Sequence, residues 1–524
     1  MDAAAENLYL RAKLAEREAE LAAKSAELSG AYLLIEQYKA QLYKLRRMQF
    51  GRSSETLDAQ IEQLELRLED LEETEAARVA ATPPPRPARA PAVRKPLPAH
   101  LPREEVVHPA GDVCPACGGM HLSALGEDVT EVLEKIPARL KVIRHVRPKF
   151  SCRACETIIQ APSPDLPIEK GRPGPGLLAH VAVSKYLDGL PLYRQSAILA
   201  REGVEIERAP LADWIGHAAW WLAPLAVRIG AHVRTAPVLH TDDTPVPLLA
   251  PGLGKTRTGR LWVYLVDERS WQGPRAPAAW YRFSPDRKGE RPREHLAGFE
   301  GTIQADAYGG YEALTRESAA PGRNTPRIAH AACWAHARRK LFDEFERTKS
   351  PIAEEALRRI GELYAVEAEI QGQSAEQRAL ARQDLARPLL EELRRYLKEQ
   401  NARLSAKSNL AKALRYALGR WEALCLYTAD GRIGIDNNPA ERALRGIAIT
   451  RKNYLFLGSE AGGERAAVIY TVLETTKLNG LDPEAYLANV IDLMAKGHPA
   501  NRLTELLPWN WKHHAGPAPP PETA

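Results

Sequence analysis

The chain has 524 residues, of which 44% are hydrophobic and 27% are charged, and its formal net charge is +5. This length exceeds one compact core and predicts three or four domains. No apolar run reaches the roughly 18 residues that span a bilayer, and the polar N-terminus lacks the apolar segment of a signal peptide. The composition therefore excludes membrane-spanning and secreted proteins and predicts a cytoplasmic one.

The first 77 residues carry the apolar repeat of a coiled coil. The residues that recur at every seventh position are Leu14, Leu21, Leu28, Ile35 and Leu42. A second apolar stripe follows a break at residues 51–54, so the segment is either a helical hairpin or a coiled coil between subunits. We favour the coiled coil, and hence a homo-oligomer. Residues 78–104 are rich in proline, alanine and arginine, which predicts an extended linker.

Residues 105–170 contain two CxxC pairs, Cys114 with Cys117 and Cys152 with Cys155. Four thiolates at this spacing match a closed, tetrahedral structural site for Zn2+. Reduced cysteines without metal in a small domain are the alternative. We predict a zinc-binding domain over this range.

A basic stretch at 137–155 contains no acidic residue. It is either a solvated basic hairpin or a surface that faces phosphates. In the second case the candidate DNA contacts are Arg144, Arg147 and Lys149.

Residues 171–235 have the composition of helices. A helix from Leu192 to Glu202, a turn at Gly203 and a helix from Ala209 to Leu222 form a candidate helix-turn-helix. Such a pair can place its second helix in the DNA major groove. The second helix carries three tryptophans, for which a place in a helical core is at least as good an interpretation as a base contact: Trp214, Trp220 and Trp221.

Five strands are predicted after residue 236, and two of them end on carboxylates. They cover 237–243, 260–267, 279–283, 301–306 and 328–333, an order that suggests a mixed sheet. Asp242 and Asp306 follow apolar runs in the first and fourth strands. Carboxylates at the ends of neighbouring strands converge, and two divalent ions need such a cluster of oxygen ligands. Either aspartate alone could instead be a turn residue.

The third carboxylate candidate, Glu441, follows a helical insertion predicted at 345–430. Pro439 suits the first helical position, which makes Asn438 the cap and Glu441 the third residue. Glu441 could therefore close a capping box, bind metal, or do both. The basic flank of the same helix suits phosphates and consists of Arg442, Arg445, Arg451 and Lys452.

Six motifs together resemble the transposases of the insertion sequence sixty-six family: HTDDTPV, QADAYGGY, HAACWAHARRK, IDNNPAERALR, RKNYLFLGS and ELLPWNW. The resemblance covers almost the whole chain. It implies a multidomain α/β protein whose core, at 236–455, is ribonuclease H-like and of the retroviral-integrase type. A C-terminal helical segment at 456–515 and a disordered tail at 516–524 would complete the chain.

The resemblance also implies a DDE triad, with Asp242, Asp306 and Glu441 as catalytic residues that hold Mg2+ or Mn2+. Asp243 stands where glutamate is the usual residue, so the choice between the two adjacent carboxylates is open; we take Asp242. The motifs further draw attention to Cys333 and His336. Two ligands are too few for a second metal site, and we favour a core cysteine with a structural or DNA-facing histidine.

We therefore expect a DNA transposase that cleaves and joins DNA at the terminal inverted repeats of an insertion sequence. Its partners would be those repeats, target DNA and accessory proteins of the same element, and it would associate with the nucleoid. Two alternatives stay open. One is a DNA-binding regulator or inactive remnant, and the other is a ribonuclease H-like nuclease without joining activity.

Overall fold

The computed structural model describes Lys13 and residues 140–147, 149–151, 158–160, 163–169, 171–250, 255–317, 328–454 and 456–511. The chain divides into two compact units, Met1–Arg144 and His145–Ala524, and the elements below belong to the second. All but Lys13 of the predicted coiled coil, the linker, the four CxxC cysteines and the predicted tail lie outside the described residues.

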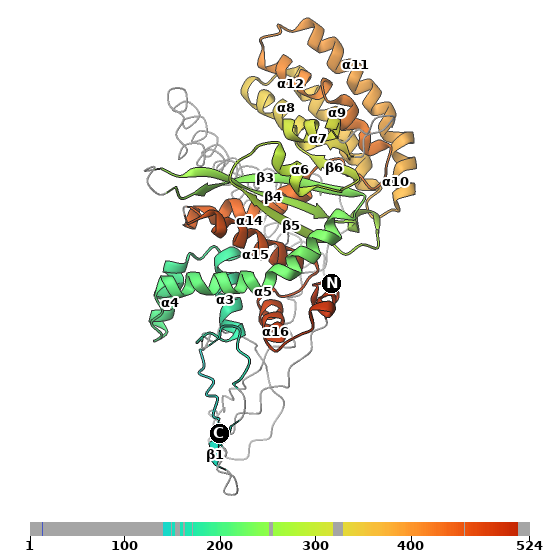
Figure 1. The fold of residues 1–524 in the computed structure, drawn as a ribbon. Coiled ribbons are helices and arrows are strands. Elements are labelled where there is room, and N and C mark those ends of the chain that lie inside the picture. Colours follow the sequence, from blue (N-terminus) through green and yellow to red (C-terminus); the bar gives the residue numbers. More distant parts are fainter. Residues whose placement is uncertain are drawn as a thin grey trace, which may run out of the picture. The chain divides into compact units, whose positions relative to one another are not determined.

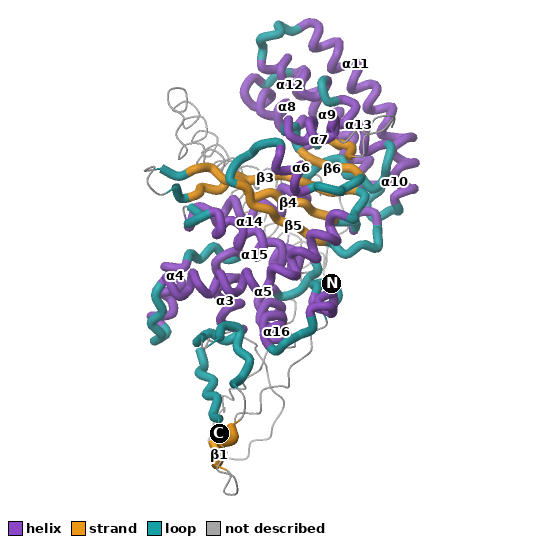
Figure 2. The backbone as a smooth tube through the Cα atoms, in the orientation of Figure 1, coloured by secondary structure: helices purple, strands orange, loops and turns teal. Residues whose placement is uncertain are grey.

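A five-stranded mixed sheet forms the centre of the second unit (Figures 1 and 2). Its strands are β3 (Val238–Leu248), β4 (Arg257–Val266), β5 (Ala278–Ser284), β6 (Gly301–Ala305) and β7 (Ile328–Ala332). They lie in the order β5-β4-β3-β6-β7. Neighbours among β5, β4 and β3 are antiparallel, whereas β3, β6 and β7 run parallel. The predicted mixed sheet is thus present.

β3 is longer than predicted, because it does not stop at Asp242 and Asp243 but pairs with β4 as far as Leu248. The added residues include Pro245 and Pro247. β3 pairs with β6 only at residues 238–240, and beyond them the same edge meets, among the described residues, only a single parallel bridge from Leu248 to Leu457. A strand with a free edge tolerates proline, which has no N–H to donate. Because β3 continues to Leu248, Asp242 lies within the strand and not at its end.

Helices cover both faces of the sheet. Against one face lie α14 (Asn438–Tyr454) and α15 (Glu460–Leu478), where the Tyr281 hydroxyl donates to the Ala443 carbonyl. Against the other lie α6 (Glu290–His295) and α7 (Gly309–Glu317), where the Trp262 ring meets Tyr311.

One long helix, α5 (Arg208–Arg234), runs against the edge strand β5. It approaches closely at Gly230, where a Cβ would lie 2.6 Å from the Trp280 ring nitrogen. The elements that complete this body are α3 (Pro175–Tyr186), α4 (Leu192–Arg201), η1 (Arg269–Trp271), α16 (Pro483–Ala495) and η4 (Ala500–Leu506). Among the described residues, none of the helices combines the length and apolar character needed to span a membrane.

The candidate helix-turn-helix corresponds to α4 and α5, but α5 continues to Arg234, well beyond the predicted end at Leu222. One side of α5 is buried in the main core from Leu211 to Val233, so it is a central packing helix. Trp214 packs on that core and the Trp221 indole donates to the Pro167 carbonyl. Trp220 is 67% exposed.

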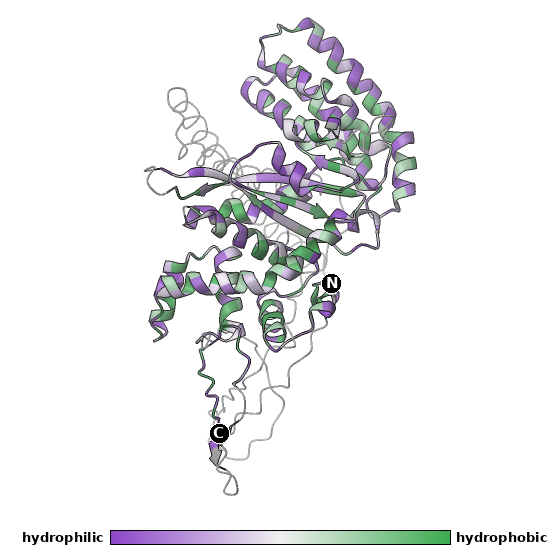
Figure 3. Ribbon diagram, viewed as in Figure 1, coloured by the Kyte–Doolittle hydropathy of each residue, from purple (hydrophilic) through white to green (hydrophobic). Residues whose placement is uncertain are grey.

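The segment between β7 and α14 is helical and has a hydrophobic core of its own. Its elements are α8 (Trp334–Thr348), α9 (Pro351–Glu369), α10 (Ala375–Ala381), the π-helical turn η2 (Arg382–Ala386), α11 (Arg387–Arg403), α12 (Asn409–Leu418), α13 (Trp421–Cys425) and η3 (Leu426–Thr428). Figure 3 shows α11 as largely hydrophilic, and its buried residues are Leu390, Leu393 and Leu397.

Candidate functional site

Asp242 lies in the middle of β3, on the face that α14 covers. Side chains alternate along a strand: Thr241 reaches the Tyr311 hydroxyl of α7, whereas His240 reaches Asn437 beside α14. Asp242 therefore shares the face of His240. Burial, and then the negative charges of Asp306 and Asp243, raise the pKa of Asp242 well above its usual range.

Asp243 points to the opposite face, where two arginines neutralise it. Its carboxylate accepts hydrogen bonds from Arg287 at 2.8 and 3.0 Å and lies 3.1 Å from Arg260. The side chain is only 1% exposed, and burial raises its pKa although both guanidinium groups oppose the rise. The two adjacent aspartates thus have different surroundings, and Asp243 is held in a buried ion-pair network.

Asp306 follows the last residue of β6 and lies beside Asp242. The parallel register joins Val238 to Thr302 and His240 to Gln304, and its continuation brings residue 306 next to residue 242. Neighbouring strands are about 4.8 Å apart. Asp306 also accepts the Tyr308 N–H at 3.0 Å and lies 3.7 Å from Arg287. The two aspartates thus come from adjacent parallel strands, and the charge of Asp306 acts on Asp242.

Glu441 enters the same region from the first turn of α14. The helix begins at Asn438, so Glu441 is its fourth residue, one position later than a capping box requires. Its carboxylate lies 3.5 Å from His336 Nδ1 and 3.6 Å from Arg339. Burial raises its pKa, Arg339 opposes the rise, and the charge of Asp306 adds to it. Asp242, Asp306 and Glu441 are thus close enough for their charges to interact.

The chemistry of these three carboxylates suits a divalent cation, although among the described residues their ligand atoms do not all lie within 4.8 Å of one another. Mutual repulsion and burial disfavour the ionised forms of Asp242 and Glu441, and a cation would relieve both costs. Oε1 of Glu441 is also buried without a hydrogen-bond partner. Hard carboxylate oxygens are the ligands that Mg2+ and Mn2+ prefer.

Cys333 and His336 lie at the start of α8 and form a cluster with Glu441. One ligand atom of each lies within 4.8 Å of the others, so the structure adds a third group to the predicted pair. The Cys333 sulfur accepts the Asn437 N–H at 3.2 Å, and burial raises the pKa of the thiol. A metal ligand must be a thiolate, so these contacts favour a buried, neutral cysteine.

The predicted DNA contacts differ in exposure. Arg144, Lys149 and Arg442 are exposed, and Arg147, Arg445 and Lys452 are half-buried. Arg451 is a correction: it is only 6% exposed, and its guanidinium donates to the Thr244 hydroxyl and the Pro245 carbonyl. It joins α14 to β3 and does not face phosphates.

The two strands β1 (Lys149–Ser151) and β2 (Ile158–Gln160) pair in antiparallel fashion on either side of the second CxxC pair. Two short paired strands on either side of a CxxC pair in the sequence are compatible with a zinc knuckle. The cysteines themselves lie outside the described residues.

Sequence reasoning missed the groups that surround the carboxylates. Arg260, Arg287 and Arg339 come from β4, the loop after β5 and α8, and nothing in their local sequence links them to Asp243 or Glu441. Arg339 stands in the basic run HARRK of one family motif, but nothing in that run points to Glu441. Asn437 stands in the motif that carries Glu441, but its contacts depend on the tertiary fold.

Comparison with protein families matches nearly the whole chain to transposases. The descriptions are "Transposase IS66 family" for residues 170–465, "Transposase C of IS166 homeodomain" for 37–106, "zinc-finger binding domain of transposase IS66" for 112–156 and "IS66 C-terminal element" for 471–509. These segments define a transposase with an N-terminal leucine zipper and a zinc finger. The chain belongs to the IS66 transposase family.

Similar proteins occur in Sinorhizobium fredii (strain NBRC 101917 / NGR234). Uncharacterized protein y4hP is 44% identical over 90% of this chain and 88% of its own length. Uncharacterized protein y4qI is 40% identical over 96% of this chain and 94% of its own length. The predicted family is therefore confirmed, and the zinc-finger match supports binding of Zn2+ by residues 112–156.

Proposed function

We propose that this transposase cleaves DNA at the terminal inverted repeats of its element and joins the ends to target DNA, with Asp242, Asp306 and Glu441 as its catalytic triad. The observation that carries the proposal is the approach of these three carboxylates from β3, the end of β6 and α14. Three antiparallel strands continued by two parallel ones, with aspartates on adjacent strands, support a ribonuclease H-like core.

The triad would hold Mg2+ or Mn2+, which supplies charge neutralisation at the phosphate and lowers the pKa of the attacking group. This chain's own residues would position the DNA. Arg287 and Arg339 flank the carboxylates and can contact phosphate oxygens, because guanidinium groups bind phosphate in a forked geometry. The proposed wider DNA surface uses Arg144, Arg147, Lys149, Arg442, Arg445 and Lys452.

The proposed reaction exchanges phosphodiester bonds without an external energy source. A water oxygen attacks the phosphorus at the end of the element, and the 3′ oxygen leaves and takes up a proton. That 3′ hydroxyl then attacks a phosphorus in the target, and the displaced target oxygen is protonated in turn. In-line attack requires the two reacting oxygens to be held on opposite sides of the phosphorus.

The other parts of the chain have proposed roles in assembly. The segment at 1–77 would pair subunits, and the zinc-binding domain at 105–170 together with 171–235 would hold the DNA ends. Accessory proteins of the same element are further proposed partners.

An Asp306→Asn protein tests the proposal, with labelled end DNA and Mg2+. We expect cleavage and joining to fall by at least about a thousandfold, because a lost metal ligand removes several kcal/mol of transition-state stabilisation. End binding in a gel-shift assay should persist. Asp492→Asn is the matched control, since Asp492 pairs with Lys496 on α16. Normal joining by Asp306→Asn protein would refute the triad.

The alternatives give different results in the same assay. A regulator or inactive remnant would bind ends tightly and never cut them. A nuclease without joining activity would cut the ends but leave pre-cut ends unjoined to target DNA.

A further inference from the structure

The segment 429–437 connects the insertion helices to α14 and is held by hydrogen bonds to its backbone. The Gln304 side chain, on β6, donates to the Gly434 carbonyl at 2.6 Å and accepts the Gly434 N–H at 3.1 Å. The Trp334 N–H, at the start of α8, donates to the Ile435 carbonyl at 3.1 Å. Gln304 is fully buried and lies two residues before Asp306. β6, which leads to Asp306, is thus also hydrogen-bonded to this connecting segment.

Asn437, at the end of the same segment, joins three elements. Its side-chain amide donates to the Thr241 carbonyl at 2.9 Å, and its oxygen lies 3.1 Å from Nδ1 of His240. An amide oxygen only accepts, so the histidine ring donates there. The Asn437 N–H reaches the Cys333 sulfur, and the residue is fully buried.

The backbone of Asn437 also starts α14. Its carbonyl accepts the N–H groups of Ala440 at 3.1 Å and Glu441 at 3.3 Å. The side chain of Asn437 therefore bonds to the two residues just before Asp242, while its carbonyl bonds to Glu441 itself. A shift of Asn437 moves the glutamate relative to both aspartates.

We infer that Asn437 and Gln304 are positioning residues that set the place of Glu441 relative to Asp242 and Asp306 for the binding of a shared cation. The inference rests on the proposed function of the triad. The two amides act at different points: Asn437 ties the helix start to β3, and Gln304 ties the segment before it to β6. Groups that orient metal ligands typically change metal affinity or activity by about 10- to 100-fold when removed.

The test compares Mn2+ binding, followed by electron paramagnetic resonance, in full-length wild-type, Asn437→Leu and Gln304→Met proteins. Leucine and methionine keep approximate shape and remove the hydrogen bonds. Asn479→Leu is the control, because the half-buried Asn479 side chain likewise donates to backbone carbonyls, those of Pro277 and Thr475. The Mn2+ signal that Asp306→Asn removes defines the site. Melting temperatures of all proteins are measured in parallel.

We expect Asn437→Leu and Gln304→Met to weaken Mn2+ binding by at least about tenfold, and Asn479→Leu to leave it unchanged even if its melting temperature falls. Lower melting temperatures with unchanged Mn2+ affinity would show a merely structural role and overturn the inference. If Asn437→Leu does not fold, the result for Gln304→Met decides alone. A wild-type protein without any Asp306-dependent Mn2+ signal would overturn both this inference and the proposed triad; normal wild-type binding with unaffected variants would overturn this inference only.

Discussion

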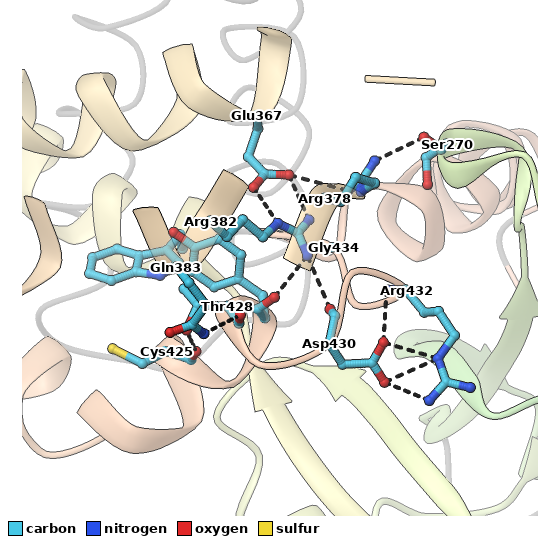
Figure 4. Close-up of polar contacts among 12 residues, drawn as sticks. Ser270, Glu367, Arg378, Arg382, Gln383, Cys425, Thr428, Asp430, Arg432 and Gly434 are labelled. Carbon is cyan, nitrogen blue, oxygen red and sulfur yellow. Dashed lines mark hydrogen bonds and ion pairs between the residues drawn. The ribbon is translucent and has the colours of Figure 1, made fainter. Parts of the chain in front are cut away.

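The carboxylate of Glu367 is shared by two buried guanidinium groups, and its removal should destabilise the insertion. Figure 4 shows Arg382 and Arg378 directed at Glu367. Arg382 donates to both carboxylate oxygens at 2.7 Å, and also to the carbonyls of Tyr427 and Asp430. Arg378 lies 3.2 Å from the carboxylate and donates to the Ser270 carbonyl. The exposed fractions of the two arginine side chains are 0% and 5%.

Glu367→Gln would leave the two buried cations Arg378 and Arg382 without a counter-charge. Arg378→Met would instead leave one anion, Glu367, paired with one cation, Arg382. Removal of one partner from a buried ion pair costs about 3–5 kcal/mol. Burial and the charge of Arg382 already lower the pKa of Arg378, so the fold disfavours its charge. Arg378→Met should therefore cost only about 1 kcal/mol, because removal of this disfavoured charge offsets part of the loss of its two hydrogen bonds.

Thermal unfolding at neutral pH, followed by circular dichroism, measures the difference. We expect the melting temperature to fall by roughly 10 °C for Glu367→Gln and by roughly 3 °C for Arg378→Met. The double variant Glu367→Gln with Arg378→Met should be more stable than Glu367→Gln alone, because it carries one fewer unpaired cation. Equal losses for the two single variants, or a double variant that is the least stable, would refute the reasoning.

Three further outcomes are expected. Light scattering of a protein that lacks residues 1–75 should show fewer subunits per oligomer than the full chain, and an unchanged number of subunits would contradict the zipper. Elemental analysis should find about one zinc per chain, with a loss in Cys152→Ser protein; zinc that persists there would contradict the four-cysteine site. Burial and the charges of Arg282 and Arg291 lower the pKa of the His295 ring to about 3. Below about pH 6.5 the ring therefore takes up a proton in the unfolded chain, whereas it stays neutral in the folded protein. Stability should fall as the pH drops, by about 2 kcal/mol between pH 6.5 and 5, and urea unfolding of His295→Gln protein should lack this part; identical pH profiles would contradict it.

The sheet was predictable because its strands are short apolar runs with β-branched and aromatic residues. The lengths of β3 and α5 were not, because Pro245, Pro247 and Pro224 look like ends of elements. β3 continues because most of its second edge has no strand to which a proline would have to donate an N–H. α5 continues past Pro224 because one side of the helix is buried in the main core from Leu211 to Val233. The neighbours of β3 and α5 in the folded protein cannot be read from the local sequence.

The candidate site, like the fold, could be predicted from the sequence only in part. The carboxylates could be named from motifs and strand ends, but their surroundings could not. Arg451 appeared to be a surface cation, yet its guanidinium is buried against β3. The choice between Asp242 and Asp243 depended on a family pattern in the sequence, whereas the structure separates them by the ion pairs that hold Asp243.

The place of the helical insertion in the chain affects the order in which a ribosome completes the proposed site. β3 and β6 are synthesised early, but α14 emerges only after all the insertion helices between β7 and residue 438. A nascent or prematurely terminated polypeptide that ends within the insertion thus carries both aspartates and lacks Glu441. If all three carboxylates are required, such a fragment cannot cut DNA. Nuclease activity then appears only in chains whose synthesis has passed the insertion.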